Sequence, residues 1–340
     1  MTSPGILDQV LHRFALESRR FRRFCFKRQC EHNDRVFDRH REHVFITGVA
    51  RSGSTALLNA LYEGGGFAST TYQLMPFVLA PSLSSVIAGI PKKTVAPTQR
   101  RHNDSIKIDL NSAEALDGIF WNTYLPRHDH HIQPREVELQ TLHYYAMFIE
   151  NLLIHFGKSR YLSKMNQGIE WVASLAGYFD RSVFLVPFRD PVQQAASLLN
   201  QHNNFSRLSS YESKYLGWLE HHEFGATHLG FFEHTQRAHP AFSPQDINYW
   251  LEQWQNGYSY LLRLVDLHPN IMPICYEQMA ASPSGWSCLS SRLGIDISGK
   301  LFVNRNDEKL KLAFEIDDSL LEACQLLYAK LSEQAGIRIC

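Results

Sequence analysis

The chain has 340 residues, and 34 lysines and arginines balance 34 aspartates and glutamates, so its formal net charge is zero. This balance argues against a nucleic-acid-binding protein, which normally carries a basic surplus to follow phosphates. Hydrophobic residues make up 44% of the chain and aromatic residues 12%, which excludes global disorder and suffices for a substantial core.

No repeat, low-complexity tract or glycine-rich linker divides the sequence, so we expect one domain over residues 1–340. Within it we expect a helical segment (5–42), a nucleotide-binding core with insertions (43–295) and a C-terminal helical segment (296–340). The six cysteines are scattered without a zinc-type spacing, and no metal is expected. The N-terminus lacks the apolar stretch of a signal peptide, so we expect a cytoplasmic protein.

Residues 5–30 are predicted to form one amphipathic helix. Its apolar residues recur at helical spacing and basic residues decorate it: Leu7, Leu11, Phe14, Phe21 and Phe24, with Arg13, Arg19, Arg20, Arg22, Arg23, Lys27 and Arg28. We favour a helix docked on its own domain with its basic face in water. Peripheral contact with a membrane surface is the alternative interpretation.

Several apolar runs are each followed by a helical pattern, which is typical of strand–helix units. The strands are expected at 43–48, 160–164, 181–190 and 270–275, and a helix is expected at 136–157. Strands that are apolar throughout and alternate with helices predict an α/β fold, with a P-loop-type parallel sheet flanked by helices on both faces. Residues 203–243 are expected to be irregular and, with other helical insertions, to form a cap on the acceptor side.

The turn from Gly48 to Thr55 has the G-x-x-x-x-G frame of a loop that cradles phosphate. Its backbone N–H groups and the following helix N-terminus attract an anion. The version that binds nucleoside triphosphates has a lysine after the second glycine, where this chain has Ser54. Its basic residue, Arg51, lies inside the loop instead. We therefore predict a site for phosphate or a similar anion that is poorly suited to a magnesium-bound triphosphate.

A second anion site is predicted at the end of a later strand. Arg189 closes that strand, and Ser197 follows about two turns into the next helix. Arg189 and the first turn of this helix can hold an anion together. An Arg-Asp-Pro tripeptide alone would more often fix a loop, so the interpretation depends on the pairing with the first turn.

The two turns together resemble those of the sulfotransferases that use 3′-phosphoadenosine 5′-phosphosulfate (PAPS), in particular bacterial members. ITGVARSGSTALLNAL is similar to the family's first loop, and F-R-D-P-x5-S is similar to its second. Two positions of the first loop differ from the usual residues, with Ala50 where proline is common and Ser54 where threonine is common. The segment YEQM, which begins at Tyr276, resembles a further family motif.

The resemblance implies a PAPS-dependent transferase that needs no metal and binds no nucleic acid. It implies a donor site formed by Arg51, Ser52, Gly53, Ser54 and Thr55 on the 5′-phosphosulfate side and by Arg189, Ser197 and Tyr276 on the 3′-phosphate side. The acceptor group is expected to be a hydroxyl or an amine. The acceptor molecule is not identified, and a carbohydrate and a small metabolite are both open. The sequence predicts no particular oligomeric state.

Sulfuryl transfer needs cations near the leaving oxygen, and Arg51 and Lys164 are the candidates. It also needs a base for an acceptor hydroxyl. Relatives often place a glutamate after the first loop, but this stretch contains Tyr72 and no carboxylate. His102 and Asp104 are the preferred substitutes for the base, because a histidine titrates near neutrality and a nearby carboxylate can orient it.

Glu114 and His202 are further candidates for the base. Two other functions stay open at this stage. One is an atypical P-loop kinase or nucleoside triphosphatase, against which the missing lysine argues. The other is a non-catalytic binding protein built on the same fold, which the missing family glutamate favours.

Overall fold

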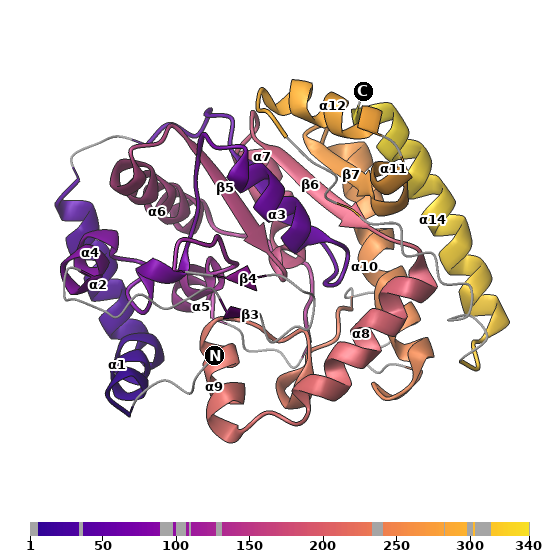
Figure 1. Ribbon diagram of the computed structural model, residues 1–340, viewed down its shortest axis with the longest axis horizontal. Coiled ribbons are helices and arrows are strands. Elements are labelled where there is room, and N and C mark those ends of the chain that lie inside the picture. The colour runs from indigo at the N-terminus through magenta and orange to yellow at the C-terminus, as the bar shows by residue number, and fades with distance from the viewer. Residues whose placement is uncertain are drawn as a thin grey trace.

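The computed structural model describes residues 6–33, 37–88, 98–99, 107–108, 110–126, 131–232, 241–281, 283–297, 302 and 314–339. Figure 1 shows a central sheet with helices packed on both faces and two helices of the N-terminal segment at one side. No helix of these ranges is both long and apolar enough to cross a membrane.

The central sheet is parallel and has five strands in the order β2-β5-β1-β6-β7. Their bounds are β1 (Val44–Thr47), β2 (Phe67–Ala68), β5 (Arg160–Met165), β6 (Val183–Phe188) and β7 (Ile271–Cys275). In β1, Val44 lies opposite Leu162 of β5 and Val183 of β6. A separate antiparallel pair joins β3 (Thr98–Gln99) and β4 (Lys107–Ile108).

Alternate side chains of the strands enter two different cores. One face is covered by α3 (Ser54–Glu63), α11 (Tyr276–Ala281) and α12 (Pro283–Leu293). The other face is covered by α6 (Leu139–Phe156), α7 (Val172–Tyr178), α10 (Ile247–Leu267) and α14 (Asp318–Ile339). Ile46 packs in the first core, whereas Phe45 packs in the second and stacks on Phe184 at 4.7 Å between ring centroids. The predicted α/β fold is confirmed, because the sheet is parallel and helices cover both of its faces. A parallel sheet is normally buried on both faces in this way.

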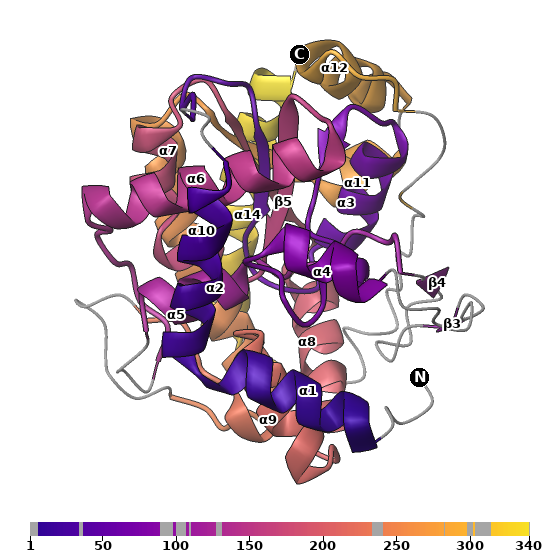
Figure 2. The same ribbon diagram turned by 90° about the vertical axis from the view of Figure 1, so that its left-hand side faces the viewer.

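The remaining helices lie around the carboxyl edge of the sheet and at its side (Figure 2). They are α1 (Ile6–Glu17), α2 (Arg19–Glu31), α4 (Pro81–Ala88), α5 (Gly118–Tyr124), α8 (Pro191–Phe205) and α9 (Ser210–Trp218), with short 3-10 turns η1 (Tyr72–Leu74), η2 (Gly168–Glu170) and η3 (Gly225–Thr227).

The prediction of one continuous helix over residues 5–30 is wrong. The helix breaks at Ser18, whose backbone is extended and whose hydroxyl accepts a hydrogen bond from the N–H of Phe21. A serine in this conformation satisfies an N–H group of the next helix, so it starts α2 rather than continuing α1.

The prediction that residues 203–243 are irregular is wrong in part. They contain α9, which a capping box stabilises: Ser209 accepts from the N–H of Glu212, and the Glu212 carboxylate accepts from the N–H of Ser209. The S-x-x-E pattern is typical of a helix N-terminus and could have predicted the start of this helix.

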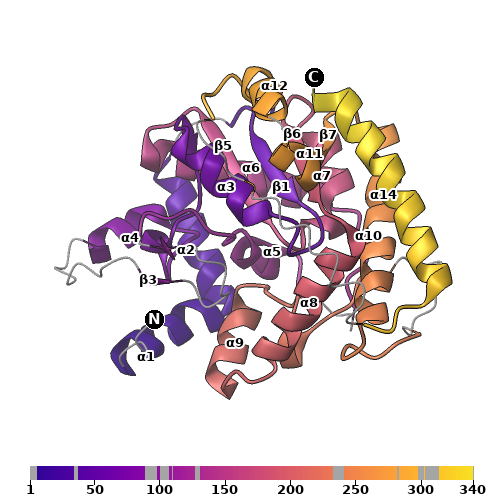
Figure 3. The same cartoon turned by 45° about the vertical axis from the view of Figure 1, so that its right-hand side comes forward.

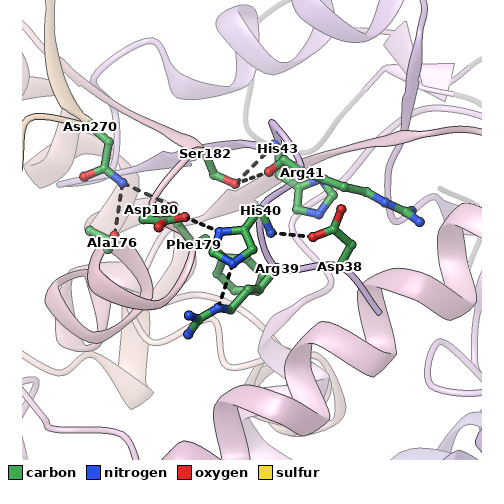
Figure 4. Close-up of polar contacts among 10 residues, drawn as sticks. All are labelled: Asp38, Arg39, His40, Arg41, His43, Ala176, Phe179, Asp180, Ser182 and Asn270. Atoms are coloured by element: carbon green, nitrogen blue, oxygen red, sulfur yellow. Dashed lines mark hydrogen bonds and ion pairs between the residues drawn. The ribbon is translucent and has the colours of Figure 1, made fainter. Parts of the chain in front are cut away.

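Polar contacts fix the amino ends of β1 and β6 (Figure 4). The Ser182 hydroxyl donates to the carbonyl oxygen of Arg41 over 3.0 Å and accepts from the N–H of His43 over 3.1 Å. His40 Nδ1 lies 3.0 Å from Asp180 Oδ1. These contacts hold the segment before β1 against the turn before β6. The turns at the opposite, carboxyl ends of the same strands carry the candidate site.

Candidate functional site

The first predicted anion loop follows β1 at the carboxyl edge of the sheet. Three of its residues have positive φ angles: Gly48 at 132°, Arg51 at 65° and Gly53 at 93°. Gly53 is the N-cap of α3, and no side chain caps this helix. The first N–H groups of a helix have no partner within it, so the start of α3 presents donors and a partial positive charge to an anion.

The second predicted loop follows β6 and is equally well formed. Asp190 caps α8, because its carboxylate accepts from the N–H of Gln193 over 3.0 Å. Arg189 Nη2 donates to Gln193 Oε1 over 2.9 Å, and its guanidinium carbon lies 4.6 Å from the ring centroid of Tyr276. Arg189 Nε is buried and makes no hydrogen bond within the described chain. A buried donor without a partner is costly, so a ligand that accepts a hydrogen bond from this nitrogen would be stabilised.

Direct contacts join the two loops, which lie close together in Figure 3. Arg51 Nε donates to Ser197 Oγ over 3.0 Å. Gln194 is fully buried between the loops and donates to the carbonyl oxygens of Val49, over 3.2 Å, and Ala50, over 2.9 Å. Its Oε1 accepts from the N–H of Arg189 over 3.2 Å. These hydrogen bonds hold the two loops side by side.

Tyr276 completes this surface from α11. A Cβ atom at Gly53 would lie 2.8 Å from Tyr276 Cδ2, so glycine is required for the ring to approach the loop. The ring also stacks on Phe302, with 4.3 Å between the ring centroids and 16° between the planes. The next residue, Glu277, accepts from the N–H of Asp190 over 3.0 Å. Tyr276 therefore lies beside both loops, with its ring near Gly53 and Arg189.

Lys164 lies on β5, the strand next to β1. It lies opposite Ile46 of β1 in the sheet, one strand away from the first loop. The side chain is only 3% exposed, and its Nζ lies 3.8 Å from Glu114 Oε1. Glu114 Oε2 accepts from the hydroxyl of Tyr72 over 2.6 Å, and Oε1 accepts from the N–H of Ala115 over 2.9 Å. Tyr72 thus holds a carboxylate that comes from a later part of the chain.

A small cavity lies beside Lys164. Residues from β5, η2 and the segment after α9 line it, among them Gln167, Trp171, Glu220, His221 and Glu223. Burial alone would raise the pKa of Glu223, but His221, at 3.5 Å, and Lys164 lower it to about 2. The cavity therefore carries an ionised carboxylate at neutral pH. Glu220 has a positive φ of 61°. Among the described residues other than glycine, Arg51 alone shares this feature.

Three of the candidate bases lie elsewhere or outside the described residues. His202 Nδ1 accepts from the N–H of Gly225 over 3.3 Å, and its ring packs on Trp250 at 5.4 Å. Burial lowers the pKa of His202. His102 and Asp104 belong to the part of the chain that the structure does not describe. In the described ranges, no three histidine, cysteine, aspartate or glutamate side chains gather as a metal site would require.

Comparison with known proteins agrees with this geometry. A family model described as the sulfotransferase family matches residues 43–239, more than half of the chain. The chain belongs to the sulfotransferase family. The matched range contains both anion loops, Glu114 and Lys164, and Tyr276 lies beyond it. A search among curated proteins gives no significant sequence match.

Solved structures are similar at low sequence identity. A sulfotransferase from Mycobacterium avium is 12% identical with a TM-score of 0.52, and the match covers 99% of this chain and 87% of that one. One from Mycobacterium tuberculosis is 10% identical with a TM-score of 0.49, covering 97% and 87%. One from Alicyclobacillus acidocaldarius is 12% identical with a TM-score of 0.38, covering 88% and 96%. The first of these supports a sulfotransferase fold.

Sequence analysis missed three residues that shape this surface: Gln194, Glu277 and Phe302. Gln194 and Glu277 each lie within a segment already matched to the family, F-R-D-P-x5-S and YEQM, so their positions were a usable signal. Phe302 lies far from either loop in the sequence, and no sequence pattern indicated its position beside them.

Proposed function

We propose that this sulfotransferase transfers a sulfuryl group from PAPS to a hydroxyl or amine of an acceptor molecule. The observation that carries the proposal is the hydrogen bond between Arg51 and Ser197, which joins the two anion loops into one surface. A donor with anionic groups at both ends of a nucleoside needs two such loops at a fixed separation. A single phosphate would need only one.

The residues present fit such a donor. Arg189 Nε is a buried donor without a partner, and α3 begins without a side-chain cap. Both features favour an anion, one in each loop. We assign Arg51, Ser52, Gly53, Ser54 and Thr55 to the 5′-phosphosulfate side. Arg189, Ser197 and Tyr276 are assigned to the 3′-phosphate side.

The bound donor supplies a sulfuryl group that moves in line from its phosphate oxygen to the acceptor atom. The sulfur–oxygen bond to phosphate breaks as the new bond forms, and the bisphosphate leaves with the added negative charge. Arg51 and Lys164 provide positive charge for that oxygen. A preorganised cation in a dry site stabilises such charge more than one in water does.

We propose Glu114 as the base that takes the acceptor proton, in preference to His102 and Asp104. Its carboxylate lies 3.8 Å from Lys164 and accepts hydrogen bonds from Tyr72 and Ala115. These contacts orient the carboxylate. Tyr72 is the positioning residue, because it holds Glu114 without itself taking the proton.

The cavity beside Lys164 is the proposed acceptor site. Its polar lining includes Gln167, Glu220 and Glu223, which suits a polyhydroxylated acceptor such as a carbohydrate or a small polar metabolite. Trp171 adds an aromatic wall.

The test is thermal melting with adenosine 3′,5′-bisphosphate, compared with ATP plus Mg²⁺. A ligand at 100 times its Kd adds about 2.7 kcal/mol to the free energy of unfolding, which a melting curve resolves. We expect the bisphosphate to raise the melting temperature, and Arg189→Ala to abolish the rise. Arg181→Ala, an exposed arginine at the other end of the same strand segment, is the matched control and should keep it.

A larger shift with ATP plus Mg²⁺ would favour an atypical P-loop kinase instead. Binding of the bisphosphate without transfer from PAPS to any acceptor of a carbohydrate and metabolite panel would favour a binding protein.

A further inference from the structure

The helix pair α1 and α2 exposes large apolar side chains. Val10 is 60% exposed, Phe14 61% and Phe24 60%. Both phenylalanines protrude from helices that are otherwise basic on their outer side. Most exposed apolar residues of a soluble surface are isolated, so an apolar set within one helix pair indicates a contact surface.

The inner side of the same pair is firmly packed. Leu16 and Phe26 are buried in the main core. Arg22 is 4% exposed, and its guanidinium donates to the carbonyl oxygen of Leu16 and, over 2.5 Å, to Asn122 Oδ1 of α5. The two helices are therefore fixed on the domain, and their outer side is a preformed surface.

The outer side carries a surplus of positive charge. We define the N-terminal basic face as the exposed residues Val10, Arg13, Phe14, Arg19, Arg20, Phe24, Lys27 and Arg28. Its neighbouring acids are already engaged, because Glu17 pairs with Arg13 at 2.9 Å and Glu31 pairs with Arg28 at 3.1 Å. No ion pair among the described residues involves Arg19 or Arg20.

Charge and apolar groups alternate closely on this face. Arg20 lies four residues before Phe24 and Lys27 lies three residues after it, which places both one helix turn away from the ring. The Phe14 ring packs on Phe21 of α2 at 4.7 Å, so the apolar residues of the two helices adjoin. Rings flanked by long basic side chains are typical of helices that lie at a membrane interface, where the rings enter the headgroup boundary and the cations meet anionic lipids.

We propose that the N-terminal basic face is a docking surface for an anionic lipid bilayer. Helices α1 and α2 lie on the near side of the molecule in Figure 2, with α4 beside them. It binds at the interface by partial insertion of Phe14 and Phe24. Arg19 and Arg20 supply the attraction to anionic headgroups.

The docking surface is connected to the acceptor cavity. Arg22 of α2 donates to Asn122, and Asn122 Nδ2 donates to Glu220, which lines the cavity. When the protein is docked through α1 and α2, two successive hydrogen bonds therefore connect the helix at the bilayer to the wall of the cavity. The docking proposal stands on the helix pair alone and does not depend on the identity of the donor.

The test is co-sedimentation of the full chain with vesicles of phosphatidylcholine alone or with about one-third phosphatidylglycerol. We expect binding only to the anionic vesicles. Arg19→Gln with Arg20→Gln should weaken the partition about thirtyfold, since each basic residue near an anionic surface contributes about fivefold. Phe14→Ser with Phe24→Ser should weaken it roughly tenfold or more. Leu326→Ser, at a residue of α14 that is 60% exposed, is the matched control and should bind as the wild type does.

The melting temperature without ligand checks that every variant is folded. Equal binding to both vesicle types, no binding to either, or full binding by the arginine pair variant would each overturn the proposal. A lipid-free dimer that is lost in the phenylalanine pair variant would also overturn it, because a second copy of the chain would then be the occupant.

Discussion

Arg51 and Ser197 lie 146 positions apart in the chain and are joined by a hydrogen bond of 3.0 Å from Nε to Oγ. Arg51 belongs to the loop after β1, and Ser197 lies on the helix after β6. Because β1 and β6 are adjacent parallel strands, their carboxyl ends meet at one edge of the sheet. The bond therefore links the two loops directly, alongside the contacts of Gln194.

Ser197→Ala should weaken the binding of adenosine 3′,5′-bisphosphate about tenfold. The substitution removes a hydrogen bond to a charged group, and Arg51 loses the contact that orients it. Isothermal titration calorimetry measures the change in Kd. Ser206→Ala is the control, because that hydroxyl donates over 2.9 Å to the carbonyl oxygen of His202 in the preceding helix turn. Equal losses in the two variants would contradict the role of Ser197.

Gly53→Ala should destabilise the protein more than Gly157→Ala does. Both glycines have positive φ angles, 93° and 61°, so both substitutions cost about 1 kcal/mol in backbone strain. Only at Gly53 would the new Cβ meet a ring, 2.8 Å from Tyr276, whereas nothing lies within 4 Å at Gly157. We expect an extra loss of about 1–3 kcal/mol in the free energy of unfolding, measured by urea denaturation.

Gly53→Ala should also displace Tyr276 and weaken bisphosphate binding. Gly157→Ala should leave that binding unchanged. A Gly53→Ala protein that binds as tightly as the wild type would show that the ring does not belong to the donor site.

Acidification should destabilise the protein through His43. Burial, followed by the charges of Arg41 and Arg160, lowers the pKa of His43 from 6.5 to about 3. Between these values the unfolded chain binds a proton that the native state does not, so stability falls as the pH is lowered below about 6.5. The loss is about 1.4 kcal/mol for each pH unit, or about 3 kcal/mol by pH 4.5.

Urea denaturation at neutral pH and at about pH 4.5 measures this dependence. In His43→Asn the amide oxygen can still accept from the N–H of Tyr161, as Nδ1 does over 3.1 Å, but nothing titrates. The loss of stability with acid should therefore shrink by about 3 kcal/mol. His32→Asn, at an exposed position, should keep the wild-type dependence. An unchanged slope in His43→Asn would mean that other buried groups carry the effect.

The sheet and the two loops at its carboxyl edge were predictable because their signals are local. An apolar run, a glycine turn and a helix start lie within one short segment of sequence at Gly48–Thr55, and again around Arg189. Chain order and the handedness of crossovers then bring such turns to one edge of a parallel sheet.

The contacts of the proposed base were not predictable in the same way. The pairing of Glu114 with Tyr72 and Lys164 joins three separate segments, and nothing near Glu114 in sequence distinguishes it from a first-turn helix acid. The break at Ser18 was missed for a different reason, because apolar spacing continued across it. A local cap outweighed the periodicity there.

Glu114→Gln should lower kcat for sulfuryl transfer by about a hundredfold or more and leave bisphosphate binding nearly unchanged. The amide keeps the shape of the side chain but cannot take the acceptor proton, and a general base contributes on the order of 10²–10⁴ in rate. Tyr72→Phe should lower kcat about tenfold, because the carboxylate loses its 2.6 Å hydrogen bond but keeps its ability to accept a proton.

The measurement is release of adenosine 3′,5′-bisphosphate from PAPS with the first acceptor that turns over in the panel. Glu63→Gln, an exposed acid at the end of α3, is the control and should react at the wild-type rate. The pH profile separates the two roles of the pair. Glu114→Gln should remove the acidic limb of kcat, since the group that must be deprotonated is gone, whereas Tyr72→Phe should keep the limb. Retention of both rate and acidic limb in Glu114→Gln would assign the base to another residue, with His102 and Asp104 the next to test.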